Sequence, residues 1–497
     1  MEKIKEGYIE LHSDLIKFPY QIIDDNESFG LFTIIMKKTP IIDKPLHLIF
    51  TIDTTLSMLE KNIGKNDEKL KIDYMKKTFK EMMIYLNNLN IIVRITVYTF
   101  NTLIELIIND EQLSNESIDI IINKINNIEC NECTNIELAL NNANKVLKDK
   151  INIYTGDKYA HIFMTDGIAN VGNMSSECLS LLINENFINI FIGFGKEHNS
   201  KMLQKFGEKK NSEYYFIDNL ENSSLVYAET IHNIIYSSLN DIKFKIINGE
   251  FYNFKTNKWT DILYENNITS ESTKFYQLKT NNPDKLEIII YEKDKEIDRI
   301  HILPELLTDD NDIIPVDLTK YMFRLKVQDL LFRGKEIINN EYCDLDSTQY
   351  INILPRMPID LKPELKQLYN DIKKYMKENN LLEDNLLKLL CEDIYITYKS
   401  QNNRYGNMYI SARQSSQGRQ SSYNVGNTLN IEENTLETIE YNVLNRISNI
   451  QSYLEDDTIV AEYELDNYIH EENSINCFAS PSLNNTFKSI SLNQEEE

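Results

Sequence analysis

An apolar run that ends in oxygen-bearing side chains is the first feature of this sequence that could do chemistry. The stretch His47–Met58 reads HLIFTIDTTLSM, and its apolar half stops at Asp53. Polar groups at the end of a buried strand need partners, so such an ending marks either a binding site or a cap on a following helix. Asp53, Thr55 and Ser57 alternate, which points their oxygens to one side of an extended segment. A carboxylate and two hydroxyls, with no His or Cys among them, suit a hard cation such as Mg²⁺.

Two later loops carry similar side chains at the same expected edge of the fold. CTNI at 133–136 precedes a helical pattern, and TDG at 165–167 follows an apolar strand pattern. Strands and helices alternate across residues 46–238, which predicts right-handed βαβ units, a doubly wound, mostly parallel sheet and helices on both faces. In such sheets ligands bind at the carboxyl ends of the strands, so we expect the three loops to meet there.

Together the three loops offer two carboxylates and three hydroxyls, a set of ligands for Mg²⁺. This ion takes about six oxygens and retains several waters. Because the hydroxyls carry no charge, the ion would remain electron-poor and would seek a strong acidic oxygen from outside. A site of this kind can bind an Asp or Glu of a partner without hydrolysing anything.

Three segments resemble the metal-binding loops of a von Willebrand factor A (vWA) domain with a metal-ion-dependent adhesion site: DTTLSM, CTNIELAL and FMTDGIANVG. The family pattern is Asp-x-Ser-x-Ser, then a Thr usually followed by Asn, then Asp-Gly. The resemblance covers about residues 46–238 and includes RITVYTF, IFIGFG and EYYFID. It implies that Mg²⁺ or Mn²⁺ binds at Asp53, Thr55, Ser57, Thr134 and Asp166. It also implies that the hydroxyls of Thr55 and Ser57 contact the ion directly, whereas the aspartates act mostly through water or by orienting the others.

The sequence departs from the family pattern at several positions around these loops. Thr55 replaces the usual Ser and keeps the hydroxyl, whereas Leu56 replaces the usual Gly, so a less permissive backbone must make the turn. Glu132 and Cys133 replace a small, Gly-rich lead into Thr134. A Glu at this position could occupy the site itself or weaken the binding of acidic partners.

Segments on either side of the α/β pattern predict further domains. Residues 1–45 contain two strand-like pieces that should join a β-sandwich, and residues 239–305 read as the short antiparallel strands of that sandwich. Residues 317–399 show the apolar spacing of a small helical bundle. Residues 400–497 are polar and acidic, which predicts a largely disordered tail with a helix near Asn434–Ile447. The start of this tail, RYGNMYISARQSSQGRQSS, is basic and Ser-rich, and reads as a solvated linker or as a phosphorylation or docking segment.

The charge and cysteine content of the chain indicate which partners and which cellular compartment to expect. The chain has 52 basic and 77 acidic residues, and its net charge of −25 argues against binding to nucleic acid or to an anionic membrane surface. No apolar run of about 18 residues predicts a membrane span, and the N-terminus has no signal-peptide core. The six cysteines are sparse, which favours a reducing, intracellular and cytoplasmic setting. Cys130 and Cys133 form a CxxC pair that cannot complete a zinc site by itself.

The leading prediction is therefore a non-enzymatic module that binds an acidic residue of a protein partner through its metal. A second hypothesis is a Mg²⁺-dependent phosphoryl hydrolase, in which an Asp that ends a strand is the phosphorylated nucleophile. Against it, Thr55 stands where a second catalytic acid would be expected, and the sequence offers no obvious lysine to hold a phosphate. A third hypothesis is a structural scaffold with an empty metal site.

Overall fold

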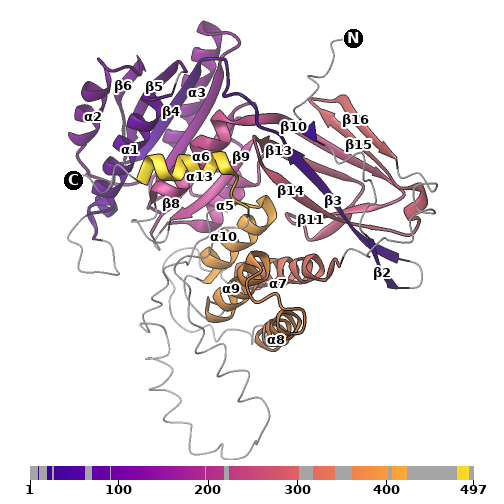
Figure 1. The fold of residues 1–497 in the computed structure, drawn as a ribbon. Helices are drawn as coiled ribbons and strands as arrows, with labels where there is room; N and C mark the ends of the chain where they lie inside the picture. Colours follow the sequence, from indigo (N-terminus) through magenta and orange to yellow (C-terminus); the bar gives the residue numbers. More distant parts are fainter. Residues whose placement is uncertain are drawn as a thin grey trace, which may run out of the picture. The chain divides into compact units, whose positions relative to one another are not determined.

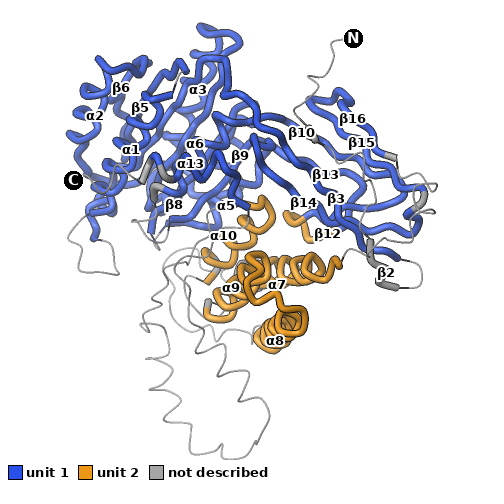
Figure 2. Tube along the Cα trace, viewed as in Figure 1, with its two compact units in different colours: residues 1–253, 259–315, 478–497 blue, residues 254–258, 316–477 orange. Residues whose placement is uncertain are grey.

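The computed structural model divides the chain into two compact units (Figure 2). Unit 1 comprises residues 1–253, 259–315 and 478–497, and unit 2 comprises residues 254–258 and 316–477. The residues that the structure describes are 9–10, 20–24, 27–61, 70–89, 91–195, 198–217, 223–301, 317–341, 361–400, 406–421 and 478–491.

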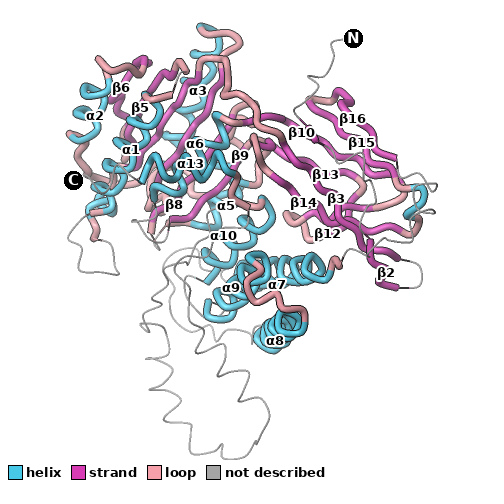
Figure 3. Tube along the Cα trace, viewed as in Figure 1, coloured by secondary structure: helices cyan, strands magenta, loops and turns pink. Residues whose placement is uncertain are grey.

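Unit 1 contains a six-stranded sheet with the order β6-β5-β4-β7-β8-β9 (Figures 1 and 3). Its strands are β4 (Leu46–Asp53), β5 (Val93–Phe100), β6 (Ile104–Gln112), β7 (Lys158–Thr165), β8 (Ile188–Phe194) and β9 (Ser212–Ile217). All neighbours are parallel except β5 and β6. That pair is antiparallel because residues 101–103 alone connect the two strands, which is too short for a crossover. This mixed, mostly parallel sheet confirms the predicted fold class.

Helices cover both faces of this sheet. They are α1 (Lys71–Asn87), α2 (Ile118–Asn126), α3 (Ile136–Ile153), α4 (Ser176–Ser180), α5 (Ser200–Gly207) and α6 (Ser223–Ile235). Phe50 of β4 packs against Phe79 of α1 with ring centroids 5.0 Å apart, whereas Ile49 packs with Val146 and Leu147 of α3. Because successive side chains of a strand point to opposite faces, α1 and α3 cover opposite sides of the sheet.

A helix from the far end of the sequence, α13 (Pro481–Ser491), packs on the outer side of α6 and α1 (Figure 1). Its Leu483 is buried, and the hydroxyl of its Thr486 lies 3.1 Å from the hydroxyl of Tyr85 on α1. The prediction of disorder is therefore wrong for this segment. Leu483 and Thr486 are three residues apart and share one helix face, so a short segment with few apolar residues still presents a packing surface.

Two antiparallel sheets form the sandwich of unit 1. One contains β1 (Ile9–Glu10), β2 (Tyr20–Asp24), β3 (Glu27–Met36), β11 (Glu250–Asn253), β12 (Lys258–Thr260) and β14 (Thr273–Thr280), and the other contains β10 (Ser237–Ile247), β13 (Ile262–Thr269), β15 (Glu287–Glu292) and β16 (Lys295–His301). The N-terminal strand β3 pairs with β14 from Ser28 to Ile35. Phe32 of β3 lies edge-on to Phe244 of β10 at 5.7 Å between ring centroids, so the N-terminal residues contribute to the core between the sheets.

Unit 2 is helical and includes part of the segment that we predicted to be disordered. Its helices are α7 (Thr319–Glu341), α8 (Lys362–Glu378), α9 (Asn385–Ser400) and α10 (Gly406–Arg419). Arg413 of α10 is fully buried and pairs with Glu392 and Asp393 of α9 at 3.0 and 3.1 Å. The interpretation of residues 406–421 as a solvated linker is therefore wrong, because the polar side chains of Arg413, Gln414 and Gln417 are buried and hydrogen-bonded. The predicted helix at 434–447 lies outside the described residues.

Candidate metal site

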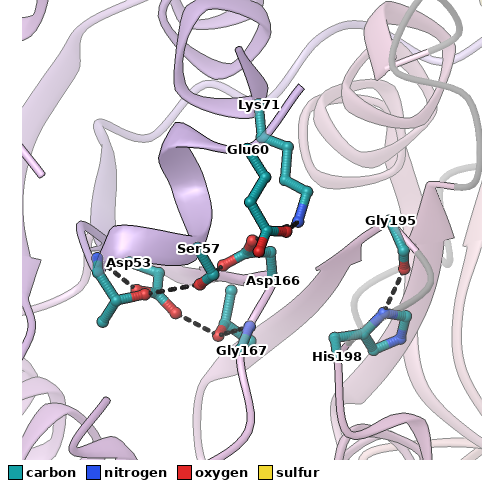
Figure 4. Close-up of polar contacts among 10 residues, drawn as sticks. Asp53, Ser57, Glu60, Lys71, Asp166, Gly167, Gly195 and His198 are labelled. Carbon is teal, nitrogen blue, oxygen red and sulfur yellow. Dashed lines mark hydrogen bonds and ion pairs between the residues drawn. The ribbon is translucent and has the colours of Figure 1, made fainter. Parts of the chain in front are cut away.

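Asp53 ends the central strand, and two hydrogen bonds hold its carboxylate. β4 and β7 are parallel neighbours, so Asp53 and Thr165 reach the same edge of the sheet. The Thr165 hydroxyl donates to Asp53 Oδ2 at 2.5 Å, and the Thr55 backbone N–H donates to Oδ1 at 3.0 Å (Figure 4). Both oxygens of Asp53 are therefore oriented by residues of the adjoining strand ends.

The first loop brings two hydroxyls together and joins them to Asp166. Thr55 Oγ1 lies 3.0 Å from Ser57 Oγ, and Ser57 Oγ donates to Asp166 Oδ1 at 2.7 Å (Figure 4). The loop turns through a short 3₁₀ helix, Leu56–Leu59, which begins directly after Thr55. Leu56 avoids positive φ and its side chain is exposed, so this turn does not need the glycine that the family pattern has.

The second loop is hydrogen-bonded to the third through Thr134. The Thr134 backbone N–H donates to Asn170 Oδ1 at 2.8 Å, and its carbonyl accepts from the backbone N–H groups of Asn170 and Val171. A Cβ atom on Gly167 would lie 3.0 Å from Thr134 Oγ1 and 3.4 Å from Asp53 Oδ2. The absence of a side chain at Gly167 thus lets the Thr134 hydroxyl approach the Asp53 carboxylate.

Together these contacts bring all five residues of the predicted site to one edge of the sheet. These are Asp53, Thr55, Ser57, Thr134 and Asp166. Glu132 belongs to the second loop but has an exposed side chain, which does not fill the site. Its φ of 63° lies in the left-handed region that favours glycine, so the loop keeps a glycine-like conformation with a glutamate in place.

Two carboxylates are buried in the site, so their negative charges are costly unless a cation lies nearby. Asp53 and Asp166 are both inaccessible to solvent. Burial, and then the like charge of Asp166, raise the pKa of Asp53 to about 7. A cation near these two carboxylates would stabilise their ionised forms.

Lys71 supplies one such cation and is a site residue that the sequence did not reveal. Its Nζ lies 2.8 Å from Asp166 Oδ2 and 2.8 Å from Glu60 Oε2 (Figure 4). The Lys71 side chain is only 7% exposed. The sequence offered no obvious lysine to hold a phosphate, and the structure places Lys71 at the site. Nothing in the local sequence distinguishes the first residue of α1 from the many other lysines of the chain.

The gathered side chains fit a hard divalent cation. Three of the five side chains are hydroxyls, and no group of three or more His, Cys, Asp or Glu side chains in the described part of the chain could hold a metal. A metal would therefore depend on the hydroxyls of Thr55, Ser57 and Thr134, with the two aspartates close by. This donor set favours Mg²⁺ or Mn²⁺ over softer metals.

A comparison with protein families agrees with this interpretation of the fold. Residues 48–168, which include all five predicted ligands, match the family model of the von Willebrand factor type A domain. A search of curated proteins found no match. Similar solved structures include a von Willebrand factor type A protein from Catenulispora acidiphila, with 12% identity, a TM-score of 0.49 and coverage of 73% of this chain and 85% of that chain. The ArnB paralog VWA2 from Sulfolobus acidocaldarius has 13% identity, a TM-score of 0.47 and coverage of 80% and 94%.

A third similar structure is proximal thread matrix protein 1 from the mussel byssus, described with a zinc-occupied MIDAS motif. It has 19% identity and a TM-score of 0.30, and the match covers 38% of this chain and 45% of that chain. The family match and the strand order of the six-stranded sheet support the same type of fold. Within unit 1, residues 48–168 match the von Willebrand factor type A domain, and the sheet around them has a vWA-like α/β fold.

Proposed function

We propose that this chain is a non-enzymatic binding module that holds Mg²⁺ or Mn²⁺ at the vWA site and binds an acidic side chain of a protein partner through it. One observation carries the proposal: five oxygen-bearing side chains from three separated loops meet at one sheet edge. The vWA fold commonly mediates protein interactions, which is consistent with this role.

The neutral charge of the hydroxyl ligands explains why such a site would favour an acidic partner. The hydroxyls of Thr55, Ser57 and Thr134 offer lone pairs without charge, so they leave the positive charge of a bound ion largely uncompensated. A bound divalent ion would supply a Lewis-acidic position for a carboxylate oxygen. Asp166 orients the Ser57 hydroxyl, both aspartates would stabilise a bound ion, and both are too deeply buried to contact the partner.

A metal-dependent phosphoryl hydrolase is the competing function, and Lys71 removes one argument against it. The ammonium of Lys71 lies within hydrogen-bond distance of Asp166 and could balance a bound phosphate. Asp53, however, has no exposed surface. A phosphate ester in solution therefore cannot reach either of its oxygens in this conformation. We therefore expect no Mg²⁺-dependent hydrolysis of generic phosphate esters, and a phosphatase assay tests this.

An intracellular setting and a partner that is not a nucleic acid belong to the same proposal. Cys130, Cys133, Cys178 and Cys391 are free thiols, as is usual in a reducing compartment. The net charge of −25 opposes contact with nucleic acid. No helix among the described residues is both long and apolar enough to cross a membrane.

Affinity purification with the full-length protein tests the proposal. Partners captured in Mg²⁺ should be lost in EDTA and lost with Asp53→Ala, because either change removes the ion. Asp119→Ala is the matched control, since Asp119 is an exposed aspartate on α2. Mass spectrometry identifies the captured proteins. Identical capture by wild type, EDTA-treated protein and Asp53→Ala would contradict the proposal, and calorimetry with Mg²⁺ and Mn²⁺ would reveal a scaffold with an empty site.

A further inference from the structure

We propose that Lys71 is a tethered cation that neutralises Asp166 when no metal is bound and that must leave Asp166 for a divalent cation to bind. This inference concerns the regulation of the same site and rests on the proposed function. It starts from the position of the Lys71 ammonium, which lies 2.8 Å from Asp166 Oδ2 in an almost completely buried side chain.

Both oxygens of Asp166 are engaged before any metal arrives. Oδ1 accepts from Ser57 Oγ at 2.7 Å, and Oδ2 accepts from Lys71 Nζ at 2.8 Å (Figure 4). A divalent cation that uses the Ser57 hydroxyl comes close to the carboxylate that already holds an ammonium. The bound cation and the Lys71 ammonium would then lie beside the same carboxylate, and two positive charges repel each other strongly in a buried site. The ion and the ammonium therefore compete for Asp166.

The Lys71 side chain is buried beside the backbone of Gly195. Gly195 has a φ of 64°, and a Cβ atom there would lie 3.5 Å from Lys71 Cε. The Gly195 carbonyl accepts a hydrogen bond from His198 Nδ1 at 2.8 Å, which fixes this backbone beside the lysine (Figure 4). The buried surroundings of Lys71 thus keep its ammonium beside Asp166.

Glu60 provides an outer position for the displaced ammonium. Its Oε2 lies 2.8 Å from Lys71 Nζ, yet 58% of its side chain is exposed. The backbone N–H of Lys71 also donates to the Glu60 carbonyl at 3.1 Å, so the two residues stay adjacent. When the ammonium leaves Asp166 it can keep its contact with the Glu60 carboxylate and move toward solvent. The exchange replaces a buried ion pair by an exposed one and makes room for the metal.

Chemical modification of lysine in the wild-type protein tests the displacement directly. Full-length protein is treated with an amine-specific reagent in EDTA and in Mn²⁺, and the modification of each lysine is measured by mass spectrometry. We expect Lys71 to be protected in EDTA and modified when Mn²⁺ is present. Lys77 is the internal control because it lies on the same helix and is partly exposed, so its modification should not change. Equal protection of Lys71 in EDTA and in saturating Mn²⁺ overturns the proposal.

Titration of Mn²⁺ into variants measures the competition. Lys71→Met removes the ammonium and should bind Mn²⁺ at least about tenfold more tightly than wild type, a gain of about 1.4 kcal/mol. Lys77→Met should bind as wild type does. Lys71→Gln is the second variant should Lys71→Met fail to fold, and circular dichroism checks both. Adding Asp53→Ala to Lys71→Met should abolish binding, which assigns the ion to this site.

The outcomes separate this inference from the proposed function. Tighter binding by Lys71→Met, or binding by Lys71→Met alone, supports the inference. Equal binding by wild type and Lys71→Met overturns the inference and leaves the metal-dependent function intact. Absence of binding in both proteins overturns the metal site, and with it the inference.

Discussion

The buried arginine of α10 leads to the strongest stability prediction, which concerns unit 2. Arg413 has no exposed surface and pairs with Glu392 and Asp393, which are 3% and 0% exposed. Replacing Arg413 by Met removes the cation and leaves two carboxylates in the interior. Breaking a buried ion pair from one side costs about 3–5 kcal/mol, because a buried charge loses its counter-ion. We expect Arg413→Met to lower the free energy of unfolding of unit 2 by this amount.

Arg333→Met is the matched control. Arg333 lies on α7 of the same unit and also pairs with two carboxylates, Asp329 at 3.3 Å and Glu364 at 2.6 Å. Its side chain is 36% exposed, and the carboxylates that it pairs with are also solvated. Exposed ion pairs contribute only about 0–1 kcal/mol. The two variants therefore remove the same chemical group and differ mainly in burial.

Hydrogen exchange of peptides from α9 and α10 measures the effect within unit 2. Arg413→Met should accelerate exchange in both helices, whereas Arg333→Met should leave them nearly unchanged. Neutralising the carboxylates with Glu392→Gln and Asp393→Asn in the Arg413→Met background should restore part of the protection. Burial already raises the pKa of Asp393, so the loss should also shrink at lower pH, where this carboxyl takes up a proton. Equal effects of Arg413→Met and Arg333→Met would refute the reasoning and would indicate that α10 is not a core helix.

Three further predictions concern unit 1. Burial lowers the pKa of His161 from 6.5 to about 4. As the pH falls below 6.5, His161 therefore takes up a proton in the unfolded chain before it does so in the folded protein. The free energy of unfolding should then decline by about 3 kcal/mol between pH 6.5 and pH 4. Burial also lowers the pKa values of His198 and His232 to about 4, so some decline remains in any His161 variant. In urea unfolding at several pH values, the decline should be smaller in His161→Gln by about this amount, and declines of equal size in both proteins would contradict the assignment. Gly167→Ala places a Cβ atom 3.0 Å from Thr134 Oγ1. It should weaken Mn²⁺ binding by about tenfold and change the melting temperature only slightly. Unchanged binding in calorimetry would show that the Thr134 hydroxyl is not a ligand. Leu483→Glu places a charge in the buried face of α13 and should accelerate hydrogen exchange in α1 and α6; unchanged exchange would mean that α13 does not cover these helices.

Local patterns were sufficient to predict the α/β sheet and the edge that carries the site. An apolar run such as the one ending at Asp53 predicts a buried strand, and in the structure β4 is buried along its whole length. Once the strand ends are known, the topology of a parallel sheet determines which loops meet. Asp53 and Asp166 could therefore be expected at one edge although 113 positions separate them, as their residue numbers show.

Composition misled the prediction where polar residues are paired in the interior. The segment around Arg413 is polar, basic and rich in serine, and these properties usually indicate solvent exposure. Its partners lie on another helix, and the pairing of Arg413 with Glu392 and Asp393 depends on how α9 and α10 pack. Composition records how many polar groups there are, but it does not record whether each one has a partner.

The sequence by itself determined the type of fold and the five oxygen-bearing side chains at the edge of its sheet, because those residues lie directly at the ends of elements whose order follows from periodicity. Only the tertiary structure decided which cation lies beside the buried carboxylate of Asp166. Lys71 reaches Asp166 from the start of a helix that is 95 residues earlier in the chain, and α13 reaches Tyr85 across 401 residues. Such contacts depend on packing distances and side-chain directions, which have no local signature in the sequence. The three loops of the site can thus be found from local sequence patterns, whereas the position of Lys71 beside Asp166 depends on the tertiary structure.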